Sequence, residues 1–381
     1  MRDWHIFCRV VDNYGDAGVG FRLAKQLANE FSIDITLWID NLAVLAKIQP
    51  QVDPSLNRQT VFKVNISRLT PNVAPPDIFP DVIIDIFGGG LPRLWLDALA
   101  RDFPAGNNIP DNEKPLWIVL EYLSAEAFVD DLHGKPSPPP NIDIPRRFFF
   151  PGFNEKSGGL LRERDLISLR DIFLQSPESR KIFFAATLGV PSLPESAMLV
   201  SVFCYDTPTL SQLFDVWNQS ATPIIALIPE GVADHAINQW HGIENALRIV
   251  SIPLISQDEY DQLLWTCDLN FVRGEDSLVR AIWAGKPFVW QAYRQENKAH
   301  MSKLSAFLTR YLADAQESEK VTLTRFTLAW NAADETSPAV RWSELVGRLP
   351  ALTKYAHNWQ LRQSQMVDLA SSLIELVRDM R

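Results

Sequence analysis

Residues 4–31 have the sequence WHIFCRVVDNYGDAGVGFRLAKQLANEF. The apolar and β-rich stretch Trp4–Val11 predicts a strand, and the spacing of apolar residues in Val19–Phe31 predicts a helix. The segment Val11–Val19 joins them and contains two glycines and two aspartates. The chain therefore starts with one strand–turn–helix unit of an α/β pattern.

The same alternation continues through the first half of the chain. Short apolar strands are expected at Asp34–Ile39, Val82–Phe87 and Leu116–Leu120. Continuous apolar strands between helices indicate a parallel sheet that is covered on both faces. The run KPSPPP at 135–140 cannot continue a helix or a central strand, and we place the domain linker within about residues 150–165.

The second half of the chain repeats this alternation. Strands are expected at Met198–Tyr205, Pro223–Ile228, Arg248–Ile252, Leu269–Val272 and Pro287–Trp290. Helices are expected at Leu210–Trp217, His235–Leu247, Tyr260–Thr266, Ser277–Ala284, Lys298–Tyr311 and, at the end, Trp359–Met380. Two such halves predict two facing Rossmann-like domains with a cleft between them, the α/β architecture called GT-B, although other two-domain α/β proteins share the pattern.

The expected domain bounds follow from this division. Residues 1–155 form the N-terminal Rossmann-like domain and residues 156–355 the C-terminal one. Residues 356–381 form a helix that is expected to pack back towards the N-terminal domain.

Composition excludes several classes of protein. The 381 residues are 46% hydrophobic and carry a net charge of −10, which argues against broad binding to nucleic acid or to an anionic membrane. Cys8, Cys204 and Cys267 form no CxxC pair and are expected to be buried free thiols. The N-terminal stretch lacks the apolar core of a signal peptide, so we expect a cytoplasmic protein.

The first candidate site is the turn between the first strand and the first helix. Gly15 and Gly18 allow a tight turn or a close approach to a ligand, and Asp12 and Asp16 place two carboxylates at the carboxyl end of the strand. The turn lacks the GxGxxG pattern of dinucleotide-binding proteins. A catalytic role for Asp16 and a structural role as a helix cap both fit the sequence.

The second candidate site is the segment FVRGEDSL at 271–278, again between a strand and a helix. Asp276 and Ser277 are residue types that often cap helices, and Gly274 suits the turn. The N–H groups at a helix N-terminus bind diphosphates, and Arg273 could add a bidentate contact to phosphate. An ordinary helix cap beside a surface arginine is the alternative. No HExxH, GxxxxGK[ST] or GxSxG motif and no metal-ligand spacing occurs, so no metal site is expected.

Four blocks of sequence resemble the family of protein-arginine rhamnosyltransferases that modify translation elongation factor P. These blocks are IFCRVVDNYGDAGVGFRLAKQLA at 6–28, LEYLSAE at 120–126, FFPGFNEKSGGLLRERD at 149–165 and FVRGEDSLVRAIWAGKPFVWQAY at 271–293. They span nearly the whole chain in the order in which the family has them. The resemblance implies a metal-independent, inverting GT-B enzyme without a cofactor. It would transfer rhamnose from dTDP-β-L-rhamnose to an arginine of elongation factor P.

The resemblance also implies roles for individual residues. Asp16 would be the catalytic base, with Asp12 and Glu275 also needed for activity. The residues implied in donor binding are Tyr205, Gln257, Tyr260, Arg273, Asp276, Ser277, Gln291 and, close by, Tyr293. Two other functions remain open: a glycosyltransferase with a lipid or polysaccharide acceptor, and a two-domain protein that binds a sugar nucleotide without turnover.

Overall fold

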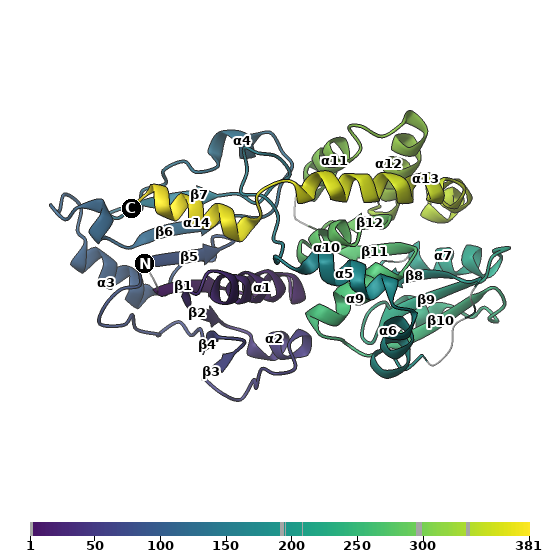
Figure 1. Ribbon diagram of the computed structural model, residues 1–381, viewed down its shortest axis with the longest axis horizontal. Helices are drawn as coiled ribbons and strands as arrows, with labels where there is room; N and C mark the ends of the chain where they lie inside the picture. The colour runs from purple at the N-terminus through teal and green to yellow at the C-terminus, as the bar shows by residue number, and fades with distance from the viewer. Residues whose placement is uncertain (1–2, 191–193, 195, 208, 295–298, 333–335) are drawn as a thin grey trace. The chain divides into compact units, whose positions relative to one another are not determined.

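The computed structural model describes residues 3–190, 194, 196–207, 209–294, 299–332 and 336–381. The chain divides into two compact units, Met1–Arg164 with Met366–Arg381, and Asp165–Gln365 (Figure 1). We expected this division between residues 155 and 156. It lies between residues 164 and 165 instead, because residues up to 164 are hydrogen-bonded to the first unit. Gln26 Nε2 donates to the carbonyl of Arg162, and the N–H of Arg164 donates to Glu30.

The first unit is built on a seven-stranded sheet with the order β3-β4-β2-β1-β5-β6-β7. The strands are β1 Asp3–Cys8, β2 Asp34–Ile39, β3 Arg58–Val61, β4 Val64–Arg68, β5 Val82–Ile86, β6 Leu116–Leu120 and β7 Arg146–Phe149. Neighbours pair in parallel, except β3 and β4, which are antiparallel. The β3–β4 hairpin lies in a region for which the sequence pattern predicted no strands.

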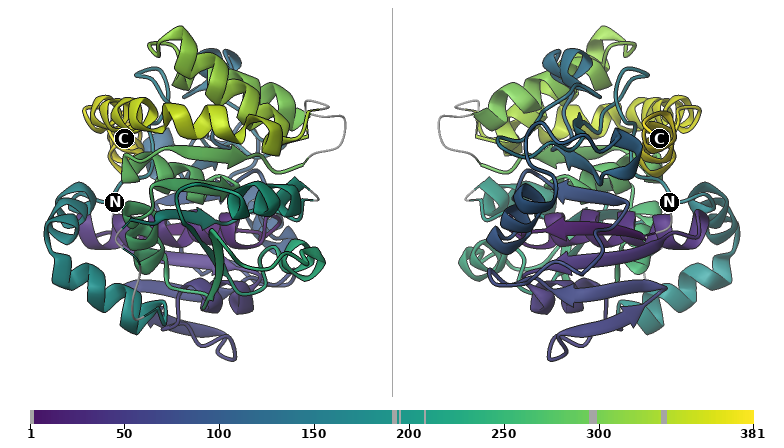
Figure 2. Two further views of the ribbon diagram at one scale, coloured as in Figure 1. Left: turned by 90° about the vertical axis from the view of Figure 1, so that its right-hand side faces the viewer. Right: turned by 90° about the vertical axis from the view of Figure 1, so that its left-hand side faces the viewer.

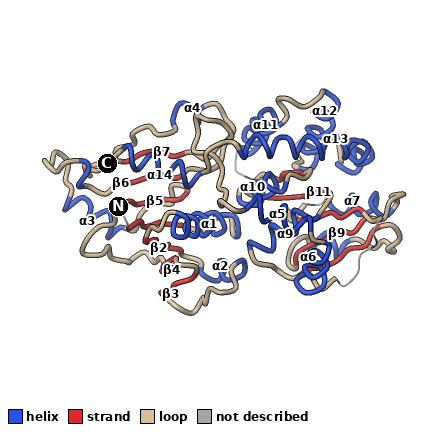
Figure 3. Tube along the Cα trace, in the orientation of Figure 1, coloured by secondary structure: helices blue, strands red, loops and turns tan. Residues whose placement is uncertain are grey.

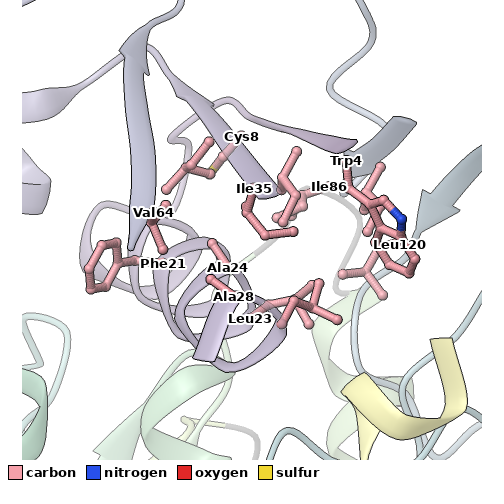
Figure 4. Close-up of a cluster of buried hydrophobic side chains, with 14 of the residues drawn as sticks. Trp4, Cys8, Phe21, Leu23, Ala24, Ala28, Ile35, Val64, Ile86 and Leu120 are labelled. Atoms are coloured by element: carbon pink, nitrogen blue, oxygen red, sulfur yellow. The ribbon is translucent and has the colours of Figure 1, made fainter. Parts of the chain in front are cut away.

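Side chains of β1 alternate between two apolar layers, as the pleat of a strand requires. Cys8 and Phe21 belong to one apolar layer (Figure 4). Leu373 is part of the same layer. Phe7 packs on the opposite face against Trp95, with ring centroids 4.8 Å apart. The helices of this unit are α1 Tyr14–Glu30, α2 Leu42–Ile48, α3 Arg93–Asp102, α4 Phe128–Leu132 and α14 Leu369–Asp379.

The second unit contains a five-stranded parallel sheet with the order β10-β9-β8-β11-β12. The strands are β8 Met198–Val202, β9 Ile224–Pro229, β10 Leu247–Ile252, β11 Leu269–Arg273 and β12 Phe288–Gln291. The helices are α5 Leu166–Gln175, α6 Pro177–Ile182, α7 Thr209–Asn218, α8 Asp234–Gln239, α9 Gln257–Thr266, α10 Asp276–Ala284, α11 Ala299–Tyr311, α12 Glu317–Trp330 and α13 Pro338–Ser364. Strands and helices alternate in both units (Figure 3), and the strands of each sheet lie side by side (Figure 2).

Two differences from the sequence prediction affect the candidate site and the tail. Helix α1 begins at Tyr14 rather than Val19, which places Asp16 inside its first turn. The predicted single helix over Trp359–Met380 is two helices, because the carboxylate of Asp368 accepts the N–H groups of Ala370 and Ser371 and so starts α14.

Candidate active site

The carboxylate of Asp16 holds the loop that precedes its own helix. Its Oδ2 accepts the backbone N–H groups of Val11 and Asp12, both at 2.7 Å. Asn13, at the cap position of α1, has a φ of 42° and makes no side-chain capping bond. Asp16 therefore does not act as the helix cap that the sequence suggested, but it does have a structural role in the turn.

Burial changes the acidity of Asp16. Its side chain is buried, and this desolvation raises its pKa above the ordinary value, as does the charge of Asp40. The two N–H groups from Val11 and Asp12 act in the opposite direction and partly offset the rise. A raised pKa makes a carboxylate a better proton acceptor near neutral pH.

Asp12 lies in the same turn. Its carbonyl accepts the N–H of Gly15 at 2.8 Å. A Cβ atom at Gly15 would lie 3.0 Å from Oδ2 of Asp12, which is tighter than most contacts of real side chains. Glycine at this position therefore lets the Asp12 carboxylate approach the first turn of α1.

A third carboxylate, which the sequence analysis missed, lies at the carboxyl end of β5. Asp85 pairs in register with Phe7 of β1, is 1% exposed and accepts the N–H of Gly90 at 2.9 Å. Burial raises its pKa to about 6, although the positive charges of Arg146 and Arg9 favour ionisation. An aspartate inside the apolar run VIIDIF was the signal that could have revealed it.

An aromatic pair follows Asp85 at the same edge of the sheet. The rings of Phe87 and Tyr122 stack with centroids 4.1 Å apart and an angle of 1° between their planes. Phe87 has a φ of 59°, an uncommon value for a bulky side chain. The loops after β1, β5 and β6 thus bring carboxylates and aromatic rings to one edge of the first sheet.

In the second unit, a tight turn joins β11 to α10. Gly274 has a φ of 63°, and its carbonyl accepts the indole N–H of Trp290 at 2.7 Å. Glu275 rather than Asp276 or Ser277 occupies the cap position of α10, and its side chain makes no capping bond. The oxygen of Ser277 instead accepts the N–H of Arg273 at 3.2 Å. The alternative interpretation, in which Asp276 or Ser277 is an ordinary cap of this helix, does not match the cap position in the structure.

The guanidinium of Arg273 is held by residues that follow β8. It lies over the rings of Phe203 and Tyr205, with its Cζ atom 4.5 and 4.7 Å from the two centroids. Its Nη1 donates to the carbonyl of Cys204 at 3.0 Å. These contacts fix the guanidinium of Arg273 beside the ring of Tyr205.

Gln291 connects the ends of β8 and β12. Its Oε1 accepts the N–H of Tyr205 at 2.8 Å. The ring of Tyr293, two residues later, lies edge-on to Tyr205 with centroids 5.6 Å apart. Gln291 is itself buried, so its side chain sets the position of Tyr205 through the backbone.

Gln257 and Tyr260 lie in the first turn of α9. Ser256 begins this helix in a capping box with Glu259, and Gln257 is buried. The ring of Tyr260 lies edge-on to Phe203 at 5.6 Å, and burial raises the pKa of its hydroxyl. A buried ion pair between Asp261 and Arg280, with N–O distances of 2.6 and 2.7 Å, joins α9 to α10.

The proposed residues thus fall into two groups. The structure brings Asp12 and Asp16 together in the first unit. The second group lies in the second unit, where the sheet's carboxyl edge meets the starts of α9 and α10: Tyr205, Gln257, Tyr260, Arg273, Glu275, Asp276, Ser277, Gln291 and Tyr293.

In the part of the chain that the structure describes, no cluster of three or more His, Cys, Asp or Glu side chains suits a metal ion. No described helix is both long and apolar enough to span a membrane.

Comparison with known families decides the class of protein. Residues 4–378 match the family described as "Elongation-Factor P (EF-P) rhamnosyltransferase EarP". The chain belongs to this EarP family. The family resemblance seen in the sequence blocks is thereby confirmed.

Curated relatives agree with this family. The chain is 40% identical to a protein-arginine rhamnosyltransferase of Pseudomonas putida, over 99% of this chain and 98% of that protein. It is 39% identical to a protein-arginine rhamnosyltransferase of Pseudomonas aeruginosa, over the full length of both. The chain is thus an enzyme of the EarP family of rhamnosyltransferases.

Solved structures confirm the fold. One described as "Structural basis for EarP-mediated arginine glycosylation of translation elongation factor EF-P" is 30% identical, with a TM-score of 0.66 over 100% of this chain and 99% of that chain. MurG of Acinetobacter baumannii is 11% identical, with a TM-score of 0.51 over 99% of both chains. The predicted GT-B class is confirmed, with one Rossmann-like sheet in each unit.

Proposed function

We propose that this enzyme transfers rhamnose from dTDP-β-L-rhamnose to one arginine side chain of translation elongation factor P, with inversion at the anomeric carbon. The observation that carries the proposal is the match to the EarP family over residues 4–378. The two groups of site residues support it, because one is acidic and the other offers an arginine and a helix N-terminus.

The acceptor requires an acidic group, since a free arginine side chain is protonated and its lone pairs are delocalised. Asp16 is the base in this proposal: it accepts a guanidinium proton as the new C–N bond forms and the bond from the anomeric carbon to the diphosphate oxygen breaks. Because Oδ2 of Asp16 already accepts two backbone N–H groups, we assign the proton transfer to Oδ1. Asp12 adds negative charge for the cationic acceptor.

The donor half of the reaction needs positive charge for the leaving diphosphate. Arg273 and the N-terminal N–H groups of α10 provide it in this proposal. Tyr205, Gln257 and Tyr260 would surround the nucleotide and sugar, and Gln291 would fix Tyr205. Glu275, Asp276 and Ser277 complete the turn that faces the diphosphate.

The test is intact-mass spectrometry of elongation factor P after incubation with the enzyme and dTDP-rhamnose. A gain of one deoxyhexose, mapped to an arginine by fragmentation, supports the proposal. Absence of any gain, from a preparation that binds dTDP, would mean that the acceptor or the donor sugar is wrong. A lipid or polysaccharide acceptor would then be tested next.

A further inference from the structure

The side chain of Glu275 contacts a helix other than the one that it precedes. Glu275 occupies the cap position of α10 with helical backbone angles, φ −97° and ψ −45°, and it makes no capping bond. Its Oε1 instead forms an ion pair with Nζ of Lys303 in α11. The sequence analysis did not identify Lys303 as a site residue.

Both members of this pair are largely removed from water. The side chain of Glu275 is 13% exposed and that of Lys303 is 20% exposed. Charges that are partly buried interact more strongly than charges on the surface, because less solvent screens them. Lys303 therefore constrains the direction of the Glu275 carboxylate and partly neutralises its negative charge.

The backbone around Glu275 is fixed by other contacts. The carbonyl of Glu275 accepts the N–H of Val279 at 3.1 Å, and the carbonyl of Gly274 accepts the indole of Trp290. These bonds set the position of the peptide. The ion pair with Lys303 of α11 acts on the side chain itself.

We propose that Lys303 is a positioning residue of the transfer reaction, which orients Glu275 and offsets its negative charge at the diphosphate-binding end of α10. The inference rests on the proposed function, because that function places the donor diphosphate at this helix N-terminus. A lone carboxylate there would repel the diphosphate, since like charges at short range raise the free energy of the complex. The lysine ammonium removes this repulsion while leaving the carboxylate in place.

The test is a double-mutant cycle with Lys303→Met, Glu275→Gln and the double variant. Lys303→Arg retains the charge, and Lys354→Met removes an exposed lysine of α13 as a matched control. Binding of dTDP is measured by calorimetry, and kcat and the KM for the donor are measured with elongation factor P. Thermal unfolding of every variant shows whether it is folded.

We expect Lys303→Met to weaken dTDP binding at least about threefold and to lower kcat at least about tenfold. Lys303→Arg should recover most of both losses, and Lys354→Met should match the wild type. In the Glu275→Gln background, the change at residue 303 should alter dTDP affinity less than about twofold, because no negative charge remains to be offset.

Three results would overturn the inference. If Lys303→Met weakens dTDP binding equally in both backgrounds, Lys303 acts on the ligand independently of Glu275. If Lys303→Met leaves binding and kcat unchanged, or if Lys303→Arg restores thermal stability but neither quantity, the pair is only structural. The dTDP measurement needs no acceptor, so a wrong acceptor in the proposed function would appear separately, as wild-type dTDP binding without transfer to elongation factor P.

Discussion

At the scale of single residues, the sequence showed which motifs lie between strands and helices but not which contacts their side chains make. The motif around Asp12 and Asp16 was visible as two carboxylates in a turn with two glycines. The hydrogen bonds from the N–H groups of Val11 and Asp12 to Oδ2 of Asp16 could not be predicted, because they depend on the residue at which α1 begins. Asp85 was missed because its partner, the N–H of Gly90, lies in a loop whose path the sequence does not determine.

Asp85 leads to a prediction about pH. Its pKa is about 6 in the folded protein, against about 3.9 in an unfolded chain. The unfolded state therefore loses its proton first as the pH rises, and stability falls between about pH 4 and pH 6. Asp85→Asn retains an acceptor for the N–H of Gly90 without the charge. We expect it to be more stable than the wild type at pH 7.5, by up to about 3 kcal/mol, with no gain below about pH 4.

Urea unfolding of both proteins at a series of pH values measures this difference. A variant that is less stable than the wild type at pH 7.5 would show that the ionised carboxylate gains more from Arg146 and Arg9 than it loses by burial.

At the scale of helices and strands, the order and type of most elements follow from the sequence. The apolar strands β1, β2, β5 and β6 were expected because parallel strands are buried on both faces. The β3–β4 hairpin was missed, because its strands are short and partly exposed and so lack a continuous apolar run. The break between α13 and α14 was missed because the apolar spacing continues across it, although the Asp368 cap starts a new helix there.

The ion pair between Asp261 and Arg280 gives a prediction at this scale. Both side chains are almost fully buried, so Arg280→Met leaves an uncompensated charge between α9 and α10. We expect a loss of about 3–5 kcal/mol in the free energy of unfolding, most of which should return when Asp261→Leu is added.

Chemical denaturation of the single and double variants measures this loss. The exposed pair of Arg93 and Asp97 in α3, with side chains 81% and 52% exposed, is the matched control. Arg93→Met should cost less than about 1 kcal/mol. Equal losses at the two sites would show that the buried pair does not hold the two helices together.

At the scale of the whole molecule, the chain passes between its two units twice, at residues 164–165 and 365–366. The C-terminal helix α14 thus completes the apolar core of the first unit, where Leu373 is fully buried. The sequence predicted a terminal helix and the unit to which it would return. It could not fix the residue at which the return begins, because that depends on contacts with Gln26 and Arg162 far away in the chain.

Leu373→Ala tests this arrangement. Removal of a fully buried leucine side chain should lower the free energy of unfolding of the first unit by about 2–5 kcal/mol. Leu361→Ala in α13, where the leucine is 44% exposed, should change stability by about 0.5 kcal/mol or less. Calorimetric unfolding of both variants measures the effect, and similar shifts for both would mean that α14 does not stabilise the first unit.

The proposed mechanism requires that Asp16 removes the proton from the acceptor arginine. The most direct measurement is the single-turnover rate of rhamnose transfer to elongation factor P by the wild type and by Asp16→Asn, with dTDP binding measured in parallel. We expect a rate about 100- to 10,000-fold lower in the variant. We also expect unchanged dTDP affinity, because the proposed donor residues lie in the other unit. A variant rate within about tenfold of the wild type would contradict the assignment of Asp16 as the base.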